Sequence, residues 1–373
     1  MSIVQYLIPF LVVLSVLVFV HELGHFWVAR RCGVKVEVFS IGFGREIFGW
    51  TDRHGTRWKV SWLPLGGYVK MFGDADAASA PSPEVADMSP EDRARSFFHK
   101  PLAQRAAVVA AGPAANFLLA IVLLAGMFAF VGQPFTPPLV GGVLPDSAAE
   151  RAGIAPGDTI AAIDGAAIER FEDIQRIVQL NLDRRMKMTV LRGGTPVDLD
   201  VTPTVVEEKD RTGNVVRIAR LGIRGQGMAF KRHDPAEAVW RAVQETWNQS
   251  AGTLKALGQM IVGSRGTEEL GGPIRIAKMS GEVAQGGAGG LLMFMAVLSI
   301  NLGLINLFPI PMLDGGHLLL YAAEAVRGRP LPQRAVEYGF RIGFALVISL
   351  MVFATWNDLV HTGVVRFLVG LVS

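Results

Sequence analysis

Apolar residues dominate four stretches of the chain, and each is long enough to cross a lipid bilayer as a helix, which takes about 20 residues. They run from about Ile3 to Ala29, Ala106 to Val131, Leu291 to Leu307 and Phe340 to Val360. The first has no Lys or Arg before it and no small-residue cleavage site after it, so it predicts an uncleaved span rather than a signal peptide. The pattern therefore predicts an α-helical polytopic membrane protein with about four transmembrane helices.

The periodicity changes after the first span. Residues 56–72 alternate apolar and polar positions around Trp58, Val60 and Trp62, directly after the turn sequence DRHG. A period of two next to a turn signal predicts a β-hairpin, and its Trp and Tyr side chains are suited to a membrane surface.

The segment between the second and third spans has two further patterns. Residues 138–204 alternate strand-like runs with glycine turns. A helical pattern then begins at Pro235, with Asp234 as its N-cap, and runs to about Val262. The glycine-rich run EVAQGGAGG that follows predicts a loose linker into the third span.

Charge adds an orientation to this picture. Lys and Arg gather after the first span, before the second, and between the third and fourth, so residues 30–105 and 321–339 are predicted to be cytoplasmic. Both termini and residues 132–290 are then periplasmic if the membrane is a bacterial inner membrane. Only 18% of residues are charged, and the absence of a basic cluster with interleaved aromatics argues against a nucleic-acid partner.

The sequence HELGH places metal-binding side chains inside the first span. His21 and His25 are four residues apart and share one helix face, so they can bind one metal together, with Glu22 close enough to act on a water held there. Gly24 is expected to keep the helix surface open beside the metal. Such residues are costly in hydrocarbon unless they are used. The alternative is a hydrogen-bonded His/Glu cluster between helices.

A zinc protease site of this type needs a third protein ligand, and NLFPIPMLDGGHL offers Asp314 and His317. Two prolines precede Asp314, and Gly315 and Gly316 let the backbone turn tightly after it. Irregular backbone at membrane depth is tolerated where it lines a cavity, which favours Asp314 as the ligand. Two alternatives stay open: Asp314 serves only as a helix N-cap, or His317 is the third ligand.

Two long motifs in this order, HELGH and NLFPIPMLDGG, resemble the site-2 protease family of intramembrane zinc metalloproteases, and within it the type of the bacterial regulator of sigma-E protease. The stretches PLGGYVKMFGD, KPLAQRAAVVAAGPAANFLLA and GGPIRIAKMSG extend the resemblance over most of the chain. It implies that His21, His25 and Asp314 bind Zn²⁺ and that Glu22 activates the water. It also implies that Asn306 helps to hold substrate or a neighbouring segment.

The run PLVGGVLPDSAAERAGIAPGDTIAAIDG resembles the start of an α+β PDZ domain, one domain where some relatives carry two in tandem. Gly141, Gly142 and Val143 match the loop that accepts a C-terminal carboxylate on backbone N–H groups. The predicted organisation is a first membrane part at 1–131, an exterior PDZ domain at 132–225, a helical linker region at 226–290 and a second membrane part at 291–373.

The resemblance implies an enzyme that cleaves the transmembrane segments of single-pass proteins. Its substrates would be an anti-sigma factor after a first exterior cut, or signal-peptide remnants. The cytoplasmic hairpin, through Trp58, Val60 and Trp62, is expected to hold an unwound substrate by strand addition. The PDZ domain would bind a free C-terminus or exclude bulky substrates. Two other functions compete: a non-catalytic membrane scaffold, which has no use for Glu22, and a metal transporter, which should show internal repeats.

Overall fold

The computed structural model describes residues 3–74, 85, 87–181, 184–209, 215–263 and 271–361. The chain divides into two compact units. The first comprises residues 1–125, 239–254 and 267–373, and the second comprises residues 126–238 and 255–266. The domain boundaries expected from the sequence, at 131, 225 and 290, stay predictions.

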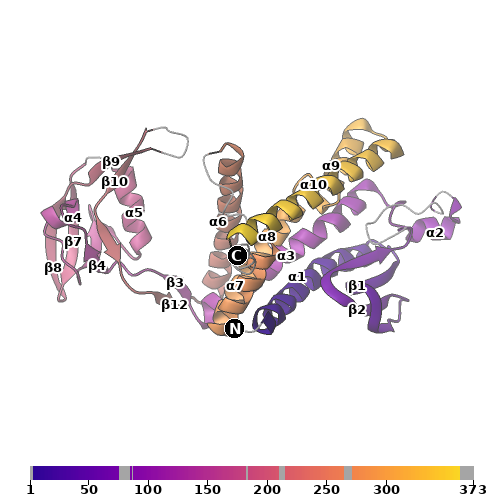
Figure 1. The fold of residues 1–373 in the computed structure, drawn as a ribbon, viewed down its shortest axis with the longest axis horizontal. Helices are drawn as coiled ribbons and strands as arrows, with labels where there is room; N and C mark the ends of the chain where they lie inside the picture. Colours follow the sequence, from indigo (N-terminus) through magenta and orange to yellow (C-terminus); the bar gives the residue numbers. More distant parts are fainter. Residues whose placement is uncertain are drawn as a thin grey trace, which may run out of the picture. The chain divides into compact units, whose positions relative to one another are not determined.

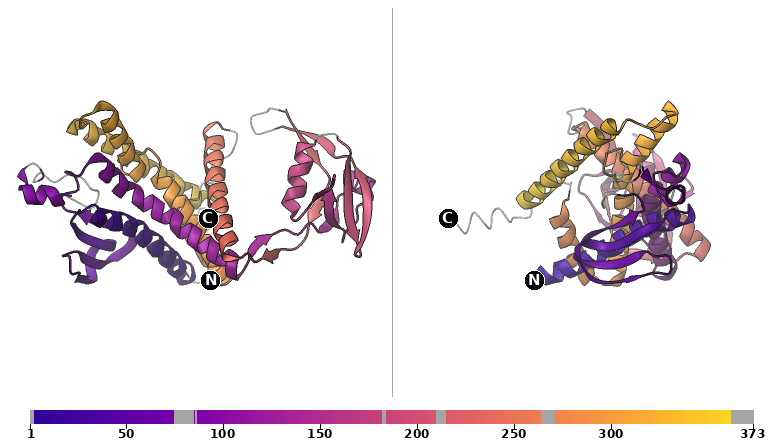
Figure 2. Two further views of the ribbon diagram at one scale, coloured as in Figure 1. Left: turned by 180° about the vertical axis from the view of Figure 1, so that it is seen from behind. Right: turned by 90° about the vertical axis from the view of Figure 1, so that its right-hand side faces the viewer.

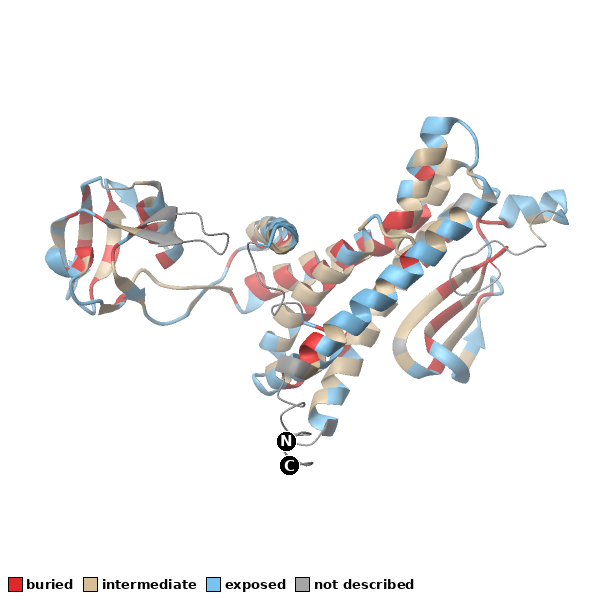
Figure 3. Ribbon diagram, turned by 45° about the horizontal axis from the view of Figure 1, so that its top comes forward, coloured by how far each residue is buried: buried red, intermediate tan, exposed pale blue. Residues whose placement is uncertain are grey.

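Four long apolar helices account for the four predicted spans. They are α1 (Ile3–Arg31), α3 (Leu102–Phe130), α8 (Ala288–Asn306) and α10 (Gln333–His361) (Figure 1). Each contains a window of at least 18 residues that is apolar enough to cross a membrane, among the residues that the structure describes. Much of α10 is exposed (Figure 3), and exposed apolar side chains such as Ile342 and Leu350 are typical of a helix that faces lipid.

The segment expected to be a loose linker is mostly helical. Helix α7 (Pro273–Gln285) includes the first residues of EVAQGGAGG, and only Gly286 and Gly287 separate it from α8. The carboxylate of Asp358 in α10 accepts hydrogen bonds from the backbone N–H groups of Gly272 and Arg275, both at 2.9 Å. The linker prediction is wrong because a residue far along the chain caps this glycine-flanked helix.

Helix α6 (Pro235–Ile261) follows the sequence pattern more closely. The Asp234 side chain accepts hydrogen bonds from the N–H groups of Ala236 and Glu237, and Pro235 occupies the first turn. These are the partners that a helix N-terminus requires, so the predicted N-cap is confirmed. Two shorter helices, α2 (Pro90–Arg95) and α9 (Asp314–Arg327), complete the helices of the first unit.

The predicted hairpin is present as β1 (Val36–Thr51) and β2 (Arg57–Met71), and it lies alongside α1 (Figures 1 and 2). Its two long strands fold back on themselves. Residues 38–41 pair on one side with 57–60 and on the other with 67–70, while 46–51 pair with 57–61. The order across the sheet is therefore 46–51, 57–61, 38–41 and 67–71, so that Gly67–Met71 forms an edge.

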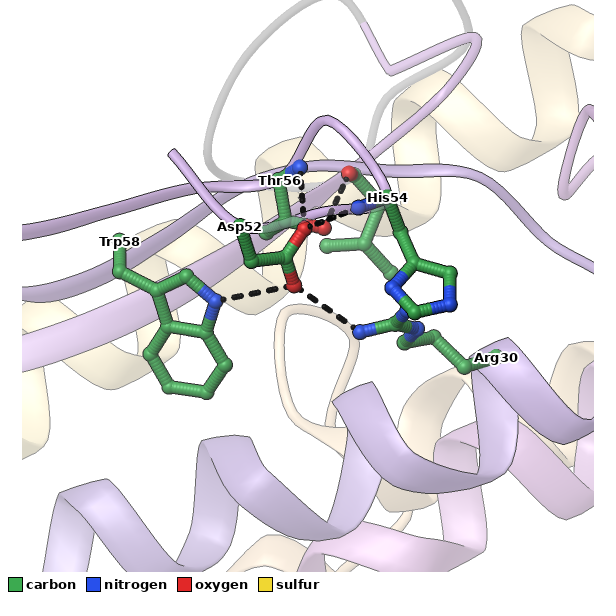
Figure 4. Close-up of polar contacts among 6 residues, drawn as sticks. Arg30, Asp52, His54, Thr56 and Trp58 are labelled. Atoms are coloured by element: carbon green, nitrogen blue, oxygen red, sulfur yellow. Dashed lines mark hydrogen bonds and ion pairs between the residues drawn. The ribbon is translucent and has the colours of Figure 1, made fainter. Parts of the chain in front are cut away.

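Asp52 fixes the turn of this hairpin to the end of α1 (Figure 4). One carboxylate oxygen accepts the N–H groups of His54 (2.8 Å) and Thr56 (3.0 Å), and the other accepts Arg30 (3.0 Å) and the Trp58 indole N–H (3.3 Å). Burial alone would raise the pKa of Asp52, but these hydrogen bonds outweigh it and hold the pKa below its usual value. The sequence DRHG is thus a turn, as predicted.

The second unit contains the other strands of the described residues. They are β3 (Gln133–Phe135), β4 (Val140–Val143), β5 (Thr159–Ile163), β6 (Ala166–Ala167), β7 (Met186–Arg192), β8 (Thr195–Val201), β9 (Thr204–Lys209), β10 (Val215–Arg220), β11 (Ile223–Gly225) and β12 (Ala229–Lys231). Helices α4 (Ala148–Arg151) and α5 (Phe171–Leu180) join them. Fully buried side chains, including Ile160, Ile174 and Met188, form its core.

Residues Gly141–Val143, which the sequence matched to a carboxylate-binding loop, lie in a short strand. They belong to β4, where Gly142 and Val143 pair with β11. On the other side of the strand, the Val140 N–H donates to the carbonyl of Asp158 at 2.8 Å. The proposal that Gly141–Val143 accepts a C-terminal carboxylate stays a prediction.

Candidate metal centre

Three side chains from two helices converge on one point. The Nε2 atoms of His21 and His25 in α1 lie 3.1 Å apart. The Asp314 carboxylate, at the start of α9, lies 3.2 Å from His21 Nε2 and 3.5 Å from His25 Nε2. Within the described part of the chain, these three residues are the group of His, Cys, Asp and Glu side chains whose ligand atoms all lie close enough to hold a metal.

The size of this triangle fits a tetrahedral zinc site. With zinc–nitrogen bonds of about 2.0–2.1 Å, two ligand atoms of a tetrahedron lie about 3.3 Å apart. The two imidazole nitrogens are 3.1 Å apart, Asp314 Oδ2 is 3.2 Å from His21 Nε2, and Asp314 Oδ1 is 3.5 Å from His25 Nε2, and all three distances are close to this value. One carboxylate oxygen, Asp314 Oδ2, is buried without a hydrogen bond from any described residue. The donor set and its geometry therefore suit Zn²⁺.

Asp314 is positioned by the break between α8 and α9. The N-cap of α9 is Leu313, and Asp314 is the first helical residue. The alternative in which Asp314 acts only as an N-cap is therefore wrong. Met312 adopts a left-handed backbone with φ of 87°, an unusual conformation for a residue with a side chain.

The glycines after Asp314 serve packing rather than a turn. Both are helical residues of α9. A Cβ atom on Gly315 would overlap the carbonyl of Leu307, and one on Gly316 would overlap that of Ile310. The expectation of a tight turn at these glycines is therefore wrong, and their role is to let the first turn of α9 pack against the preceding loop.

Helix α3 supports both histidines from behind. His25 Nδ1 lies 2.9 Å from the carbonyl oxygen of Val108, and His21 Nδ1 lies 3.1 Å from the side-chain amide nitrogen of Asn116. A Cβ atom on Gly112 would overlap both imidazole rings, so this position must be glycine for the rings to fit. The contact between Asn116 and His21 could not be predicted from the sequence, because no local signal relates two residues 95 positions apart.

Gly24 has a different role from the one expected. A Cβ atom there would collide with the Ala111 carbonyl and with the Ala115 side chain of α3. The glycine therefore permits the close approach of α1 and α3 and does not open the helix surface beside the metal. The earlier interpretation is wrong because this face of α1 packs against a helix.

A cavity of about 190 Å³ adjoins the three donors. Glu22 lines it from α1, Asn306 from the end of α8, and His317 from α9. The edge strand contributes Gly67, Tyr68, Val69 and Met71. The Val69 backbone also hydrogen-bonds to Glu22, which ties this strand to the site. His317 lines the cavity but does not belong to the three-residue donor group.

The hairpin residues predicted to contact substrate lie elsewhere in the sheet. Trp58 stacks on Phe39 with 4.4 Å between the ring centroids and on Trp50 with 5.9 Å. Val60 belongs to the segment that is paired on both sides, while Trp62 is 67% exposed. Strand addition needs an unpaired edge, so Trp58 and Val60, which are paired on both sides, are not suited to it. The assignment of Trp62 stays a prediction. The sequence pattern located the hairpin but did not show that it folds back.

Comparison with known proteins agrees with these features. The model of peptidase family M50 matches residues 9–350. A protein of Rhizobium meliloti (strain 1021), provisionally named a zinc metalloprotease, is 48% identical over 361 residues, which cover 95% of this chain and 96% of the relative. Metalloprotease MmpA of Caulobacter vibrioides is 40% identical over 389 residues, which cover 98% of each chain.

The solved structures add a weaker likeness. The crystal structure of the PDZ domain of an SdrC-like protein from Listeria innocua is 20% identical over 24% of this chain and 94% of that chain, with a TM-score of 0.20. The assignment of residues 132–225 as a PDZ domain stays a prediction.

Proposed function

The chain belongs to peptidase family M50, the site-2 protease family, and is a multi-pass membrane zinc metalloprotease; from this premise we propose that it hydrolyses peptide bonds within the transmembrane segments of single-pass proteins. The single observation that carries the proposal is the convergence of Asp314, at the start of α9, with His21 and His25, which lie in a helix apolar enough to span a membrane. Such polar side chains are retained in a span when they are used.

We assign His21, His25 and Asp314 as the zinc ligands. Zinc bound there supplies a Lewis acid and lowers the pKa of a water molecule towards 7. Glu22 lines the same cavity and is the proposed general base, which takes a proton from the attacking water and passes it to the leaving amine. The Val69 backbone orients the Glu22 carboxylate until substrate enters.

The edge strand Gly67–Met71 is the proposed docking site for the substrate backbone. A transmembrane helix satisfies its own hydrogen bonds and must be unwound before it can be cleaved. Among the residues that the structure describes, 67–70 pair with β1 on one side only, and Gly67, Tyr68, Val69 and Met71 line the cavity beside Glu22. An extended substrate added to this edge would lie along the metal centre, with Asn306 on the α8 side of the cavity.

The proposed setting is a bacterial inner membrane, with both termini and the predicted PDZ domain in the periplasm. The distribution of Lys and Arg supports this orientation. The substrate class would then be single-pass proteins whose exterior part has already been trimmed, such as an anti-sigma factor, or signal-peptide remnants. A sterically filtering PDZ domain would select for trimmed substrates.

The deciding experiment compares wild type with Glu22→Gln. Each is expressed with a tagged single-pass substrate trimmed on its exterior side, and zinc is measured on the purified full chain. We expect Glu22→Gln to keep its zinc and to lose about 10²- to 10⁴-fold in cleavage rate, the usual contribution of a general base. A variant that cleaves as fast as wild type would show that Glu22 is not the base.

The docking edge has its own test. A photo-crosslinking amino acid replaces either Tyr68, which lines the cavity, or Trp62, which is exposed in another part of the hairpin. We expect substrate to crosslink to position 68 and much less to position 62. A stronger crosslink from position 62 would move the docking site away from the edge strand.

A further inference from the structure

Asn116 is a buried amide in contact with one of the proposed zinc ligands. It lies on α3, is 0% exposed, and its amide nitrogen is 3.1 Å from His21 Nδ1. Its amide oxygen is buried without a hydrogen bond from any described residue. Buried polar atoms are rarely left in this state, and the exceptions call for an explanation.

We propose that Asn116 is a positioning residue for the metal centre, and that its amide oxygen accepts a hydrogen bond from the Nδ1–H group of His21. This inference rests on the proposed ligand set. A histidine that binds zinc through Nε2 has no proton on that nitrogen, so its Nδ1 carries the proton and needs an acceptor. The oxygen and nitrogen of an amide exchange places by a half-turn, which puts the unpartnered oxygen against Nδ1.

His25 provides an internal reference for this arrangement. Its Nδ1 faces the carbonyl oxygen of Val108 at 2.9 Å. A carbonyl can only accept, so His25 Nδ1 must be the donor and Nε2 is left free for the metal. With Asn116 as an acceptor, His21 adopts the same tautomer, and α3 orients both imidazoles.

The packing of α3 against α8 does not require the side-chain amide of Asn116. Asn116 also connects α3 to α8, because the Ser299 hydroxyl donates to its carbonyl oxygen at 2.7 Å. That carbonyl belongs to the backbone, and any residue at position 116 would supply it. The side chain of Asn116 therefore contacts His21, and its backbone carbonyl accepts the hydrogen bond from Ser299.

The test measures zinc affinity on the purified full chain by competition with a chromophoric chelator. Asn116→Leu removes the acceptor at similar volume, whereas Asn116→Asp keeps an acceptor in the same place. We expect zinc affinity to fall about 10- to 100-fold in Asn116→Leu and to stay within about threefold of wild type in Asn116→Asp. The visible absorption of the cobalt-substituted protein should change in the leucine variant and be restored in the aspartate variant.

Ser299→Ala is the matched control, since it removes the other hydrogen bond of Asn116 and leaves the amide intact. Its zinc affinity should equal that of wild type. Wild-type affinity in Asn116→Leu, or an equal loss in the leucine and aspartate variants, would overturn the inference. If Asn116→Leu does not fold, Asn116→Ala carries the same comparison. Full zinc affinity in His21→Ala would instead defeat the proposed ligand set, so the two failures are distinguishable.

Discussion

Two aspartates of the first unit have opposite surroundings. Asp52, at the hairpin turn, accepts four hydrogen bonds from His54, Thr56, Trp58 and Arg30. Asp314, at the start of α9, has a buried oxygen without a hydrogen bond from any described residue, and it faces two imidazoles. All the hydrogen bonds of the Asp52 carboxylate come from the protein, and they fix the hairpin turn to α1. The Asp314 carboxylate has capacity left for a ligand.

Asp314→Asn should cause the largest change. Loss of a charged ligand should weaken zinc binding more than about 100-fold, beyond the usual effect of a residue outside the ligand set. Chelator competition on the purified full chain measures this, and Asp52→Asn is the control whose zinc affinity should not change. Wild-type zinc affinity in Asp314→Asn would contradict the proposal that Asp314, unlike Asp52, binds the metal.

Asp52→Ala should act on the fold and leave the metal centre unchanged. The substitution removes the charged acceptor of four hydrogen bonds. We therefore expect the free energy of opening the hairpin turn to fall by about 1–3 kcal/mol. Hydrogen exchange of the amides of residues 57–60 reports this opening. His54→Ala is the control, because His54 contributes its backbone N–H and its side chain is exposed. Equal exchange in both variants would refute the anchoring role.

Asp158 in the second unit, like Asp52, is a carboxylate held by donors of the protein, and its contribution to stability depends on pH. It is 1% exposed, and Arg192 donates to both of its oxygens at 2.8 and 2.7 Å, which holds its pKa below the usual value. The unfolded chain then binds more protons than the folded one in acid, so the stabilisation is complete above about pH 4 and declines as the pH falls further. Hydrogen exchange of β5 between pH 3 and 7 measures it. An unchanged acid slope in Asp158→Asn would rule out this carboxylate as the cause.

Arg30→Gln should have the smallest effect. Arg30 pairs with Asp52 at 3.0 Å, but it is partly exposed to solvent, and such pairs contribute about 1 kcal/mol or less. Exchange at residues 57–60 should rise less than in Asp52→Ala. Arg31→Gln is the matched control, since Arg31 stacks on Trp27 and makes no ion pair with Asp52. A larger effect from Arg31 would contradict this ranking.

The features that the sequence predicted are local ones. A long apolar run, the i, i+4 spacing of His21 and His25, and Asp234 before Pro235 each depend on residues within one or two turns. The third metal ligand, Asp314, was proposed because two prolines and a glycine pair interrupt a span, which is again a local signal.

The features that it did not predict depend on contacts between distant segments. Residues 38–41 pair with two parts of β2, and nothing in the alternating pattern distinguishes an edge from a central strand. Helix α7 is capped by Asp358, which lies 86 positions from Gly272. The sequence suggested that Gly24 leaves space beside a metal. Only the position of α3 shows that Gly24 lies where α1 and α3 pack together.

The two supports that α3 gives to the histidines have a thermodynamic consequence. Val108 and Asn116 contact one imidazole each, so the register of α3 against α1 is part of the geometry of the ligands. The coupling is reciprocal. If sliding α3 along α1 weakens zinc binding by some factor, bound zinc makes that sliding less favourable by the same factor. Bilayer thickness acts on the tilt of apolar helices. With zinc held by the proposed ligands, a change in bilayer thickness that shifts α1 against α3 would therefore also change the affinity for zinc.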